Sequence, residues 1–138
     1  MKFTLPSPKN PLKVGTRSSP LALVQAREVC IRLSREFNLP IQSFKIIKIN
    51  TLGDKIIDRP LHQIGGKGLF TKEIEDELLS GKIDIAVHSM KDMPVRQPEG
   101  LLIDTFLPRE DARDAFMSFA ASSLRELDSR TTLGSSSV

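Results

Sequence analysis

IDIAVHSMKDMP, residues 83–94, joins a nearly continuous apolar run directly to a cluster of polar side chains. The apolar part, residues 83–87, is typical of a strand that is buried on both faces, as in parallel sheets covered by helices. The polar part, called the polar cluster below, consists of His88, Ser89, Lys91 and Asp92. These side chains either close off the end of a strand or are held there for chemistry.

The segments before this stretch alternate between strand and helix patterns. Residues 12–16 predict a short strand, and residues 17–37 predict a helix with Ser18 or Ser19 as N-cap and Pro20 in its first turn. An apolar stripe runs along this helix at spacings of three and four: Leu23, Ala26, Cys30, Leu33 and Phe37. Because the cysteine lies within the stripe, we interpret it as a small core residue and not as a reactive thiol.

Strand and helix patterns continue up to the polar cluster. Residues 41–49 predict a second strand, residues 50–68 a long glycine-rich loop, and residues 69–81 a second helix that Gly81 ends. The strand at 83–87 follows. This alternation favours an α/β fold in which helices cover the faces of a parallel sheet.

The composition changes after the polar cluster. The segment PVRQPEG (94–100) is where the chain is expected to leave the first domain. Beyond it, residues 100–108 predict a strand, residues 109–116 a charged turn, residues 122–128 a short capped helix, and residues 131–138 a strand that runs into a serine loop.

Composition excludes several classes of protein. The 138 residues carry a net charge of +3 without a basic stripe and contain no Trp or Tyr, which argues against nucleic-acid binding and suits a pocket for a small polyanion. No apolar run approaches the roughly 20 residues of a membrane span. Residues 1–11, with three prolines, are interpreted as a loose leader. The single cysteine, Cys30, favours a reducing compartment, so we expect a cytoplasmic protein.

Ligands of open parallel sheets bind beyond the carboxyl ends of the strands. There, GTRSSP (15–20) places Arg17 and two hydroxyls at a helix N-terminus, which attracts anions, although plain capping explains the serines equally well. GGKG (65–68) presents Lys67 before a helix but lacks the spacing of a P-loop. The arginines of the 109–116 turn are either solvated or bind carboxylates across a cleft.

The polar cluster has alternatives of its own. His88 is more often a hydrogen-bonded residue at a strand end than a catalytic group. Lys91 and Asp92 could cap the turn or pair with each other, but adjacent residues seldom face each other. The aspartate is better suited to stabilise a cationic intermediate while the lysine holds anionic groups. No metal site is predicted, because His62 and His88 lack ligand spacing to each other or to carboxylates.

Five motifs, in this order, resemble the porphobilinogen deaminase family, also called hydroxymethylbilane synthase. They are TRSSPLALVQA (16–26), GDKIID (53–58), IGGKGLFTKEIE (64–75), DIAVHSMKDMP (84–94) and REDARDAF (109–116). The resemblance extends over about residues 13–138. Five motifs in the same order are highly specific.

The resemblance implies a transferase of tetrapyrrole (heme) biosynthesis that removes ammonia from porphobilinogen and joins four pyrroles head to tail, giving hydroxymethylbilane. It implies a type II periplasmic-binding-protein-like sheet with flanking helices. Residues 12–99 would form domain 1, completed by a later return of the chain, residues 100–108 a crossover, and residues 109–138 the beginning of domain 2. It also implies a dipyrromethane cofactor on a cysteine of a third domain. Cys30 does not match that anchor by motif.

Site residues follow from the same matches. Asp92 matches the family's catalytic aspartate, which hydrogen-bonds pyrrole N–H groups and offsets positive charge. The other matched positions contact substrate or cofactor, or lie in a loop over the cleft: Arg17, Ser19, Gln25, Lys67, Ser89, Lys91, Ser135, Ser136 and Ser137. The first serine of the run stands where the family more usually has threonine.

The family continues from this serine run into two adjacent arginines, which the sequence does not contain. We therefore expect the chain alone to be inactive, and either marginally stable or self-associating, whereas the full-length enzyme is expected to be a monomer. The alternative is a non-catalytic small-anion-binding module of the periplasmic-binding-protein type. Such a module would have no need of Asp92 beside Lys91.

Overall fold

The computed structural model describes residues 4–56 and 68–135. Lys67, Ser136, Ser137 and most of the predicted loop at 50–68 therefore lie outside the described residues. The chain divides into two units, Met1–Ile103 and Asp104–Val138, and each is described by itself.

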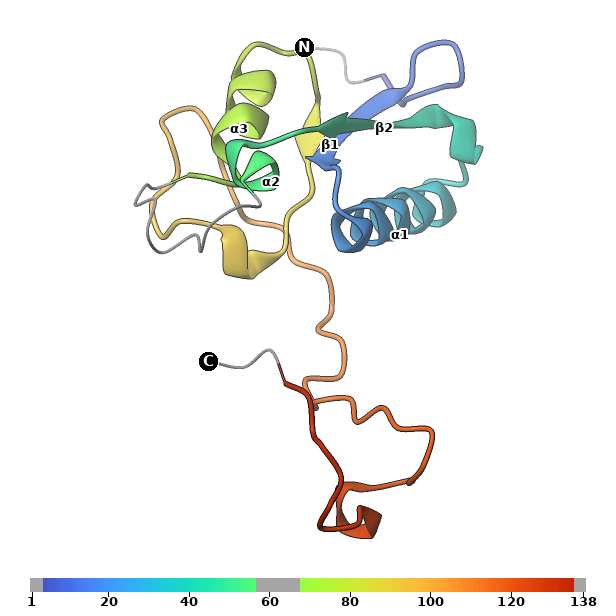
Figure 1. Ribbon diagram of the computed structural model, residues 1–138. Helices are drawn as coiled ribbons and strands as arrows, with labels where there is room; N and C mark the ends of the chain where they lie inside the picture. The colour runs from blue at the N-terminus through green and yellow to red at the C-terminus, as the bar shows by residue number, and fades with distance from the viewer. Residues whose placement is uncertain (1–3, 57–67, 136–138) are drawn as a thin grey trace. The chain divides into compact units, whose positions relative to one another are not determined.

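A three-stranded parallel sheet forms the centre of the first unit (Figure 1). Its strands, in the order β2-β1-β3, are β2 (Phe44–Ile49), β1 (Leu12–Arg17) and β3 (Ile85–Ala86). In the central strand, Val14 lies opposite Ile46 on one side and Ile85 on the other. The prediction of an α/β fold with a parallel sheet and flanking helices is thereby confirmed.

β3 is shorter than the strand predicted at 83–87, but its hydrogen bonds extend past its ends. The backbone N–H of Asp84 donates to the carbonyl of Lys13 and that of Val87 to Gly15, both at 2.9 Å. Strand boundaries commonly differ by a residue or two in this way. The polar cluster therefore begins where pairing with β1 stops.

α1 (Pro20–Glu36) packs on the sheet through small side chains. Ser19 is its N-cap and accepts a hydrogen bond from the backbone N–H of Ala22 at 3.4 Å, while proline occupies the first turn, as predicted. Ala26 and Cys30 join Val14 of β1 in the core. No helix among the described residues is long and apolar enough to cross a membrane.

The apolar stripe predicted along α1 is buried at its centre, as expected, but exposed at its C-terminal end. Cys30 is only 4% exposed, whereas Phe37 is 51% exposed. The helix ends at Glu36, so Phe37 is its C-cap and leaves the face that packs on the sheet. Burial also raises the pKa of the Cys30 thiol, which favours the unreactive protonated form.

α2 (Leu52–Lys55) and α3 (Lys72–Leu79) belong to the other side of β1. Side chains alternate along a strand, so Val14 faces α1 while Gly15 and Arg17 face away from it. A Cβ on Gly15 would lie 2.2 Å from Cδ1 of Ile83, so a larger residue here would require that side chain to move. Within α3, Ile74 is fully buried.

The second predicted helix is present but shorter than expected. α3 begins at Lys72 and not at Leu69, because residues 68–71 form a turn in which Thr71 N–H donates to the Gly68 carbonyl. Gly81, with a φ of 70°, follows the helix in the left-handed conformation that glycine adopts readily, as predicted. The short helix α2 was not predicted.

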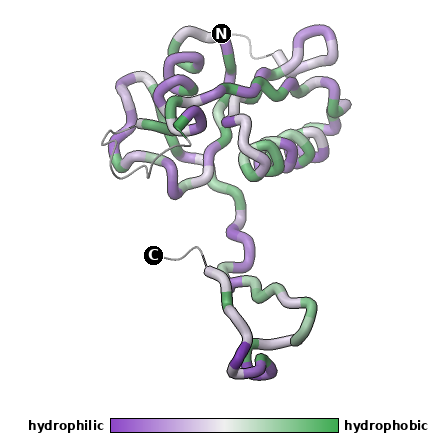
Figure 2. Tube along the Cα trace, viewed as in Figure 1, coloured by the Kyte–Doolittle hydropathy of each residue, from purple (hydrophilic) through white to green (hydrophobic). Residues whose placement is uncertain are grey.

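The strands predicted at 100–108 and from residue 131 are wrong, because the described residues of these segments form no strand. No strand occurs between 101 and 135, and the predicted helix at 122–128 is a single 3-10 turn, Leu124–Glu126. Figure 2 shows that hydrophobic stretches nevertheless occur there, and Phe106 is 64% exposed. An extended segment becomes a strand only when another backbone pairs with it.

Candidate functional site

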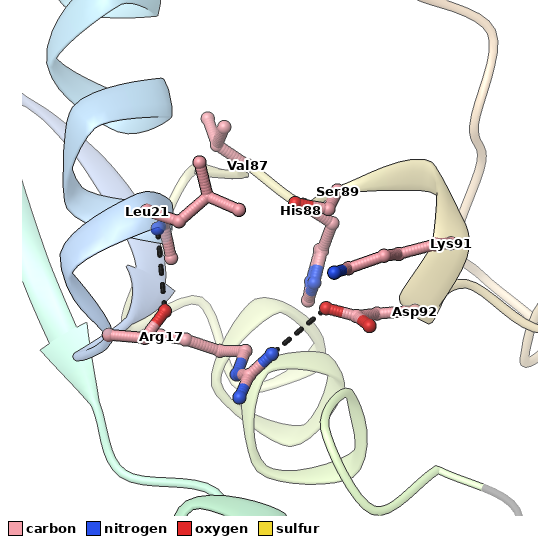
Figure 3. Close-up of a pocket in the computed structure, with 9 residues that line it drawn as sticks. Arg17, Leu21, Val87, His88, Ser89, Lys91 and Asp92 are labelled. Carbon is pink, nitrogen blue, oxygen red and sulfur yellow. Dashed lines mark hydrogen bonds and ion pairs between the residues drawn. The ribbon is translucent and has the colours of Figure 1, made fainter. Parts of the chain in front are cut away.

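The ends of β1 and β3 bring the first and third candidate segments together. Arg17 is the last residue of β1, and a 3-10 helix (Met90–Asp92) after β3 carries Lys91 and Asp92. Between them lies a pocket of about 140 Å³ (Figure 3). It is lined by Arg17, Ser19, Leu21, Ala22, Val87, His88, Ser89, Lys91 and Asp92.

Arg17 is the centre of the polar contacts at this pocket. Its Nη1 donates to Oδ2 of Asp92 at 2.9 Å, and its Nη2 and Nε donate to Oδ1 of Asp54 at 2.5 and 3.2 Å. These three side chains are only 14–17% exposed. The guanidinium carbon also lies 4.0 Å from the centroid of the Phe70 ring, a cation–π distance. Arg17 is thus fixed in one orientation.

The ion pairs set the charge of these groups. The hydrogen bond to Asp54 is the largest cause of a raised pKa at Arg17. Burial acts to raise the pKa of Asp54, but hydrogen bonds from Arg17 and Thr51 outweigh it, and the pKa lies below its ordinary value. Arg17 is therefore a permanent cation and Asp54 a carboxylate at neutral pH.

Asp54 and Phe70 were not identified as site residues from the sequence. Asp54 belongs to a capping box at the start of α2, in which the backbone N–H of Asp54 donates to Thr51 Oγ1 and the backbone N–H of Thr51 donates to Asp54 Oδ2, both at 3.3 Å. Thr51 Oγ1 also donates to Asp54 Oδ2 at 2.8 Å. Gly53 lies against Phe70, since a Cβ there would be 2.3 Å from the ring. The available signals were the Thr-x-x-Asp spacing of a capping box and the GDKIID motif.

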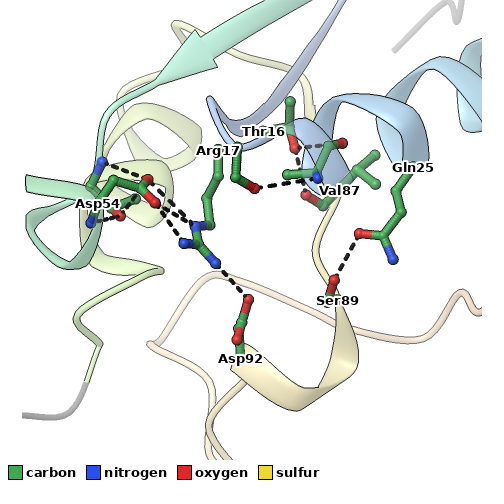
Figure 4. A network of polar contacts seen from close by, with 10 residues as sticks. Thr16, Arg17, Gln25, Asp54, Val87, Ser89 and Asp92 are labelled. Atoms are coloured by element: carbon green, nitrogen blue, oxygen red, sulfur yellow. Dashed lines mark hydrogen bonds and ion pairs between the residues drawn. The ribbon is translucent and has the colours of Figure 1, made fainter. Parts of the chain in front are cut away.

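Ser89 and Gln25 are joined by a hydrogen bond (Figure 4). Ser89 Oγ donates to Gln25 Oε1 at 2.7 Å, which ties the polar cluster to α1. Nearby, Thr16 is fully buried and its Oγ1 donates to the carbonyl of Val87 at 3.2 Å. Ser19 combines the two roles considered for it, because it caps α1 and also lines the pocket.

Lys91 does not pair with its neighbour. Asp92 is paired with Arg17, while Lys91 lines the pocket, is exposed, and makes no ion pair within the described chain. An ammonium group in this position can bind an anionic ligand without first giving up a partner.

Within the polar cluster, His88 is the residue that has a buried ring nitrogen without a hydrogen bond to the described chain. Its Nδ1 is buried and has no hydrogen-bond partner within the described residues. Burial is the largest influence and lowers the pKa of His88; Asp92 and Glu75 act in the opposite direction, and Arg17 acts with burial. The expected hydrogen bond at this strand end is therefore absent from the part of the chain that is described.

The remaining candidates are not among the residues that the described part of the first unit brings together. Ser135 is exposed in the second unit, and Lys67, Ser136 and Ser137 are outside the described residues. In the charged turn, Arg113 Nε donates to Asp111 Oδ1 at 2.9 Å, a local contact between exposed side chains. Among the described residues, no group of three or more His, Cys, Asp or Glu side chains could hold a metal ion.

These features define an α/β fold with a pocket at the carboxyl edge of its parallel sheet, the edge where such sheets commonly bind ligands, and with two cations and a carboxylate on the pocket wall. Residues 12–138 match the family model for porphobilinogen deaminase, dipyromethane cofactor binding domain. The chain belongs to the porphobilinogen deaminase family, as its motifs predicted.

Curated relatives agree with this assignment. The chain is 57% identical over 134 residues to the porphobilinogen deaminase of Paracoccus denitrificans, covering 97% of this chain and 43% of that protein. It is 53% identical over 129 residues to the chloroplastic porphobilinogen deaminase of Oryza sativa subsp. japonica, covering 92% and 36%. For that of Nitrobacter winogradskyi, the identity is 53% over 125 residues, covering 91% and 40%. The chain thus spans less than half the length of each.

Proposed function

We propose that this chain carries the substrate-activating site of a porphobilinogen deaminase, a transferase of tetrapyrrole and heme biosynthesis that releases ammonia and joins four porphobilinogen molecules into hydroxymethylbilane. The observation that carries the proposal is the Arg17–Asp92 ion pair on the wall of a pocket at the carboxyl edge of the sheet. Family membership supports the reaction.

The chemistry of porphobilinogen suits this pocket. The molecule bears acetate and propionate side chains, and loss of its ammonia leaves an electron-poor azafulvene. The Asp92 carboxylate accepts hydrogen bonds from pyrrole N–H groups and offsets the positive charge that develops on the ring. Arg17, Lys91 and Ser19 are the groups on the pocket wall that hold the carboxylates.

Six further residues have supporting roles in this proposal. Ser89, which Gln25 holds, contacts the side chains of the cofactor. Lys67 and the serines at 135–137 contact carboxylates of the substrate or of the growing chain.

The side chains on the pocket wall also suit dipyrromethane, the cofactor in the name of the matched domain. Asp92 supplies an acceptor for pyrrole N–H groups, and Lys91, which has no ion pair within the described chain, supplies a cation for the carboxylates. When bound, the cofactor supplies the pyrrole carbon from which the product chain grows. Cys30 is unsuited to anchor it, because it is 4% exposed within the core.

The pairing of Arg17 favours an enzyme over the alternative, a non-catalytic anion-binding module. A module built for anions gains from arginines that are free to bind the ligand. Here two carboxylates already share the guanidinium. That arrangement costs anion affinity but places a negative charge beside the ligand, as stabilisation of a cationic intermediate requires.

We further propose that the sheet belongs to a type II periplasmic-binding-protein-like domain. The order β2-β1-β3 supports this, because one of the two common orders of doubly wound parallel sheets, 2-1-3-4-5, begins with it. Residues 12–99 would then be domain 1, with the crossover at 100–108 and domain 2 from 109.

The test is a chimera in which residues 12–138 replace the matching segment of the Paracoccus denitrificans relative, called the chimera below. We expect the purified chimera to release ammonia from porphobilinogen at a rate within about tenfold of the parent enzyme. A folded chimera that releases none would contradict the proposal. The polypeptide of residues 1–138 alone should not sustain release, because its one cysteine is in the core.

A further inference from the structure

We infer that His88 is the proton acceptor of this site when two pyrrole units are joined, an inference that rests on the function proposed above. His88 lines the same pocket as Arg17, Lys91 and Asp92, immediately after β3. Figure 3 shows its ring directed into the space that Lys91 and Asp92 border.

The two ring nitrogens of His88 are in different surroundings. Nδ1 is buried without a partner in the described chain. Nε2 also makes no hydrogen bond to a described residue, but it is not fully buried, so it is the ring nitrogen that a ligand in the pocket can reach. A buried polar atom without a partner is costly and uncommon, and such groups are often found where a protein carries out chemistry.

Charged groups from three elements face the imidazole. Arg17 of β1 disfavours a positive charge on it, while Asp92 of the 3-10 helix and Glu75 of α3 favour one. Lys91 of the same 3-10 helix also lines the pocket. Burial outweighs the carboxylates and lowers the pKa, so the resting imidazole is neutral. Glu75 also has a buried oxygen, Oε1, without a partner among the described residues. The site thus holds a neutral base with two carboxylates that stabilise its protonated form.

The coupling of two pyrrole units requires such a base. After porphobilinogen has lost ammonia, an electron pair of the attacking ring forms a carbon–carbon bond to the exocyclic methylene of the azafulvene, whose own ring regains its aromatic electrons. The α-carbon of the attacking ring then carries both the new bond and its original hydrogen. Breaking that C–H bond returns the electron pair to the ring, and His88 Nε2 takes the proton. Solvent then takes this proton from His88. The proton released to solvent balances the one that the departing ammonia takes up.

Asp92 is less suited to this step than His88. Its carboxylate is ion-paired with Arg17 at 2.9 Å, and it offsets charge only while it remains ionised. A neutral imidazole can accept a proton without removing that negative charge. The two residues therefore divide the work, with Asp92 stabilising the cation and His88 accepting the proton.

Kinetics of the chimera test the inference. His88→Gln should lower the turnover number at pH 7.5 by at least about 10²-fold, the usual contribution of a general base. In the unsubstituted chimera, turnover should fall as the pH drops through the pKa of His88, because the protonated ring cannot accept a proton. Glu75→Gln removes a charge that raises this pKa, so the acid limb should move to lower pH. Asp76→Asn, an exposed neighbour on α3, should leave it in place.

A second measurement requires no change at His88. The sequence has one other histidine, so His62→Gln leaves a single imidazole whose nitrogens can be followed by NMR in residues 1–138. We expect a neutral ring at pH 7 that becomes protonated below the ordinary histidine pKa of about 6.5, and at still lower pH after Glu75→Gln. A ring that is charged at pH 7 would overturn the inference, even if His88→Gln fails to fold.

The two proposals fail in different ways. An active chimera in which His88→Gln is folded and retains its turnover number and pH profile would overturn only the role of His88. An intact chimera that is folded and inactive would overturn the proposed function, and the role of His88 with it.

Discussion

Two arginine–aspartate pairs in this chain make the same chemical contact in different settings. Arg17 and Asp92 are 75 residues apart, lie 2.9 Å from each other, and have side chains that are 17% and 14% exposed. Arg130 and Asp128 are two residues apart, lie 3.1 Å from each other, and are 89% and 55% exposed. The first pair connects two elements of the fold, whereas the second closes a local turn.

The difference shows that an ion pair matters to the fold and the site through the elements that it holds together. Exposed pairs contribute little to stability, because water and salt screen them and two long side chains must be ordered. The Arg17–Asp92 pair instead joins the end of β1 to the segment after β3, with Asp54 and Phe70 supporting the guanidinium. Substitutions made in matched positions of the two pairs can test this contrast.

The largest difference should come from the aspartates. Asp92→Asn keeps the size of the side chain but removes the charge that stabilises the azafulvene, so the chimera should lose about 10²- to 10³-fold in turnover. Asp128→Asn in the exposed pair should change turnover by less than twofold. Rates of ammonia release at saturating porphobilinogen measure both. Equal rates for the two variants would remove the contrast and, with it, the catalytic role of Asp92.

The arginines should differ in stability and in substrate capture. Arg17→Leu leaves two largely buried carboxylates without their partner, so it should lower the free energy of unfolding of residues 1–138 by about 1–3 kcal/mol. In the chimera it should also lower kcat/KM for porphobilinogen, whose carboxylates lose a cation. Arg130→Leu should change stability by no more than about 0.5 kcal/mol. Urea unfolding and initial rates at low substrate check the two parts, and kcat/KM unaffected by Arg17→Leu would count against this pocket.

A smaller effect is expected from the cap that positions Asp54. Thr51→Ala removes a capping hydroxyl and should cost about 1 kcal/mol of stability, as helix N-caps commonly do. Ser123, at the start of the 3-10 turn in the second unit, makes no capping bond to the backbone, so Ser123→Ala should cost less stability. Thermal unfolding of the two variants distinguishes them, and equal losses would show that α2 does not support the site.

The smallest effect should be an acid dependence of stability. The pKa of Asp54 is lower in the folded chain than in the unfolded chain, so its contribution is present above about pH 4 and is lost as the pH falls through the lowered value. Asp54→Asn should remove this part of the acid dependence. Asp128→Asn should not, because its local pair can also form in the unfolded chain. Urea midpoints between pH 5 and pH 2 measure the difference.

The parts of the fold that the sequence predicts correctly are those that local pattern determines. The start of α1 follows from serine and proline chemistry, and the strands at β1 and β2 follow from apolar runs. The strand at 100–108 was predicted wrongly, since Phe106 and its neighbours have a strand's composition but no described partner. Pattern specifies which residues favour an extended conformation, but pairing depends on distant segments.

The same distinction applies to the site. The rule that ligands bind at the carboxyl ends of parallel strands correctly brought Arg17, Ser89 and Asp92 to one edge. It did not find Asp54, because the position of that carboxylate depends on the four-residue helix α2, which was not predicted. The buried Nδ1 of His88, which has no hydrogen-bond partner among the described residues, was also not predictable. Whether a buried atom is paired depends on three-dimensional packing.

In the proposed site, Arg17 and Asp92 act as one unit on the substrate and do not merely close the end of a sheet. A double-mutant cycle in the chimera measures this, with Arg17→Leu, Asp92→Asn and the double variant compared by kcat/KM for ammonia release. We predict a coupling of about 0.5–3 kcal/mol, so that the double variant is faster than the product of the two separate losses. Losses that simply multiply, or unchanged rates in all three variants, would contradict the account.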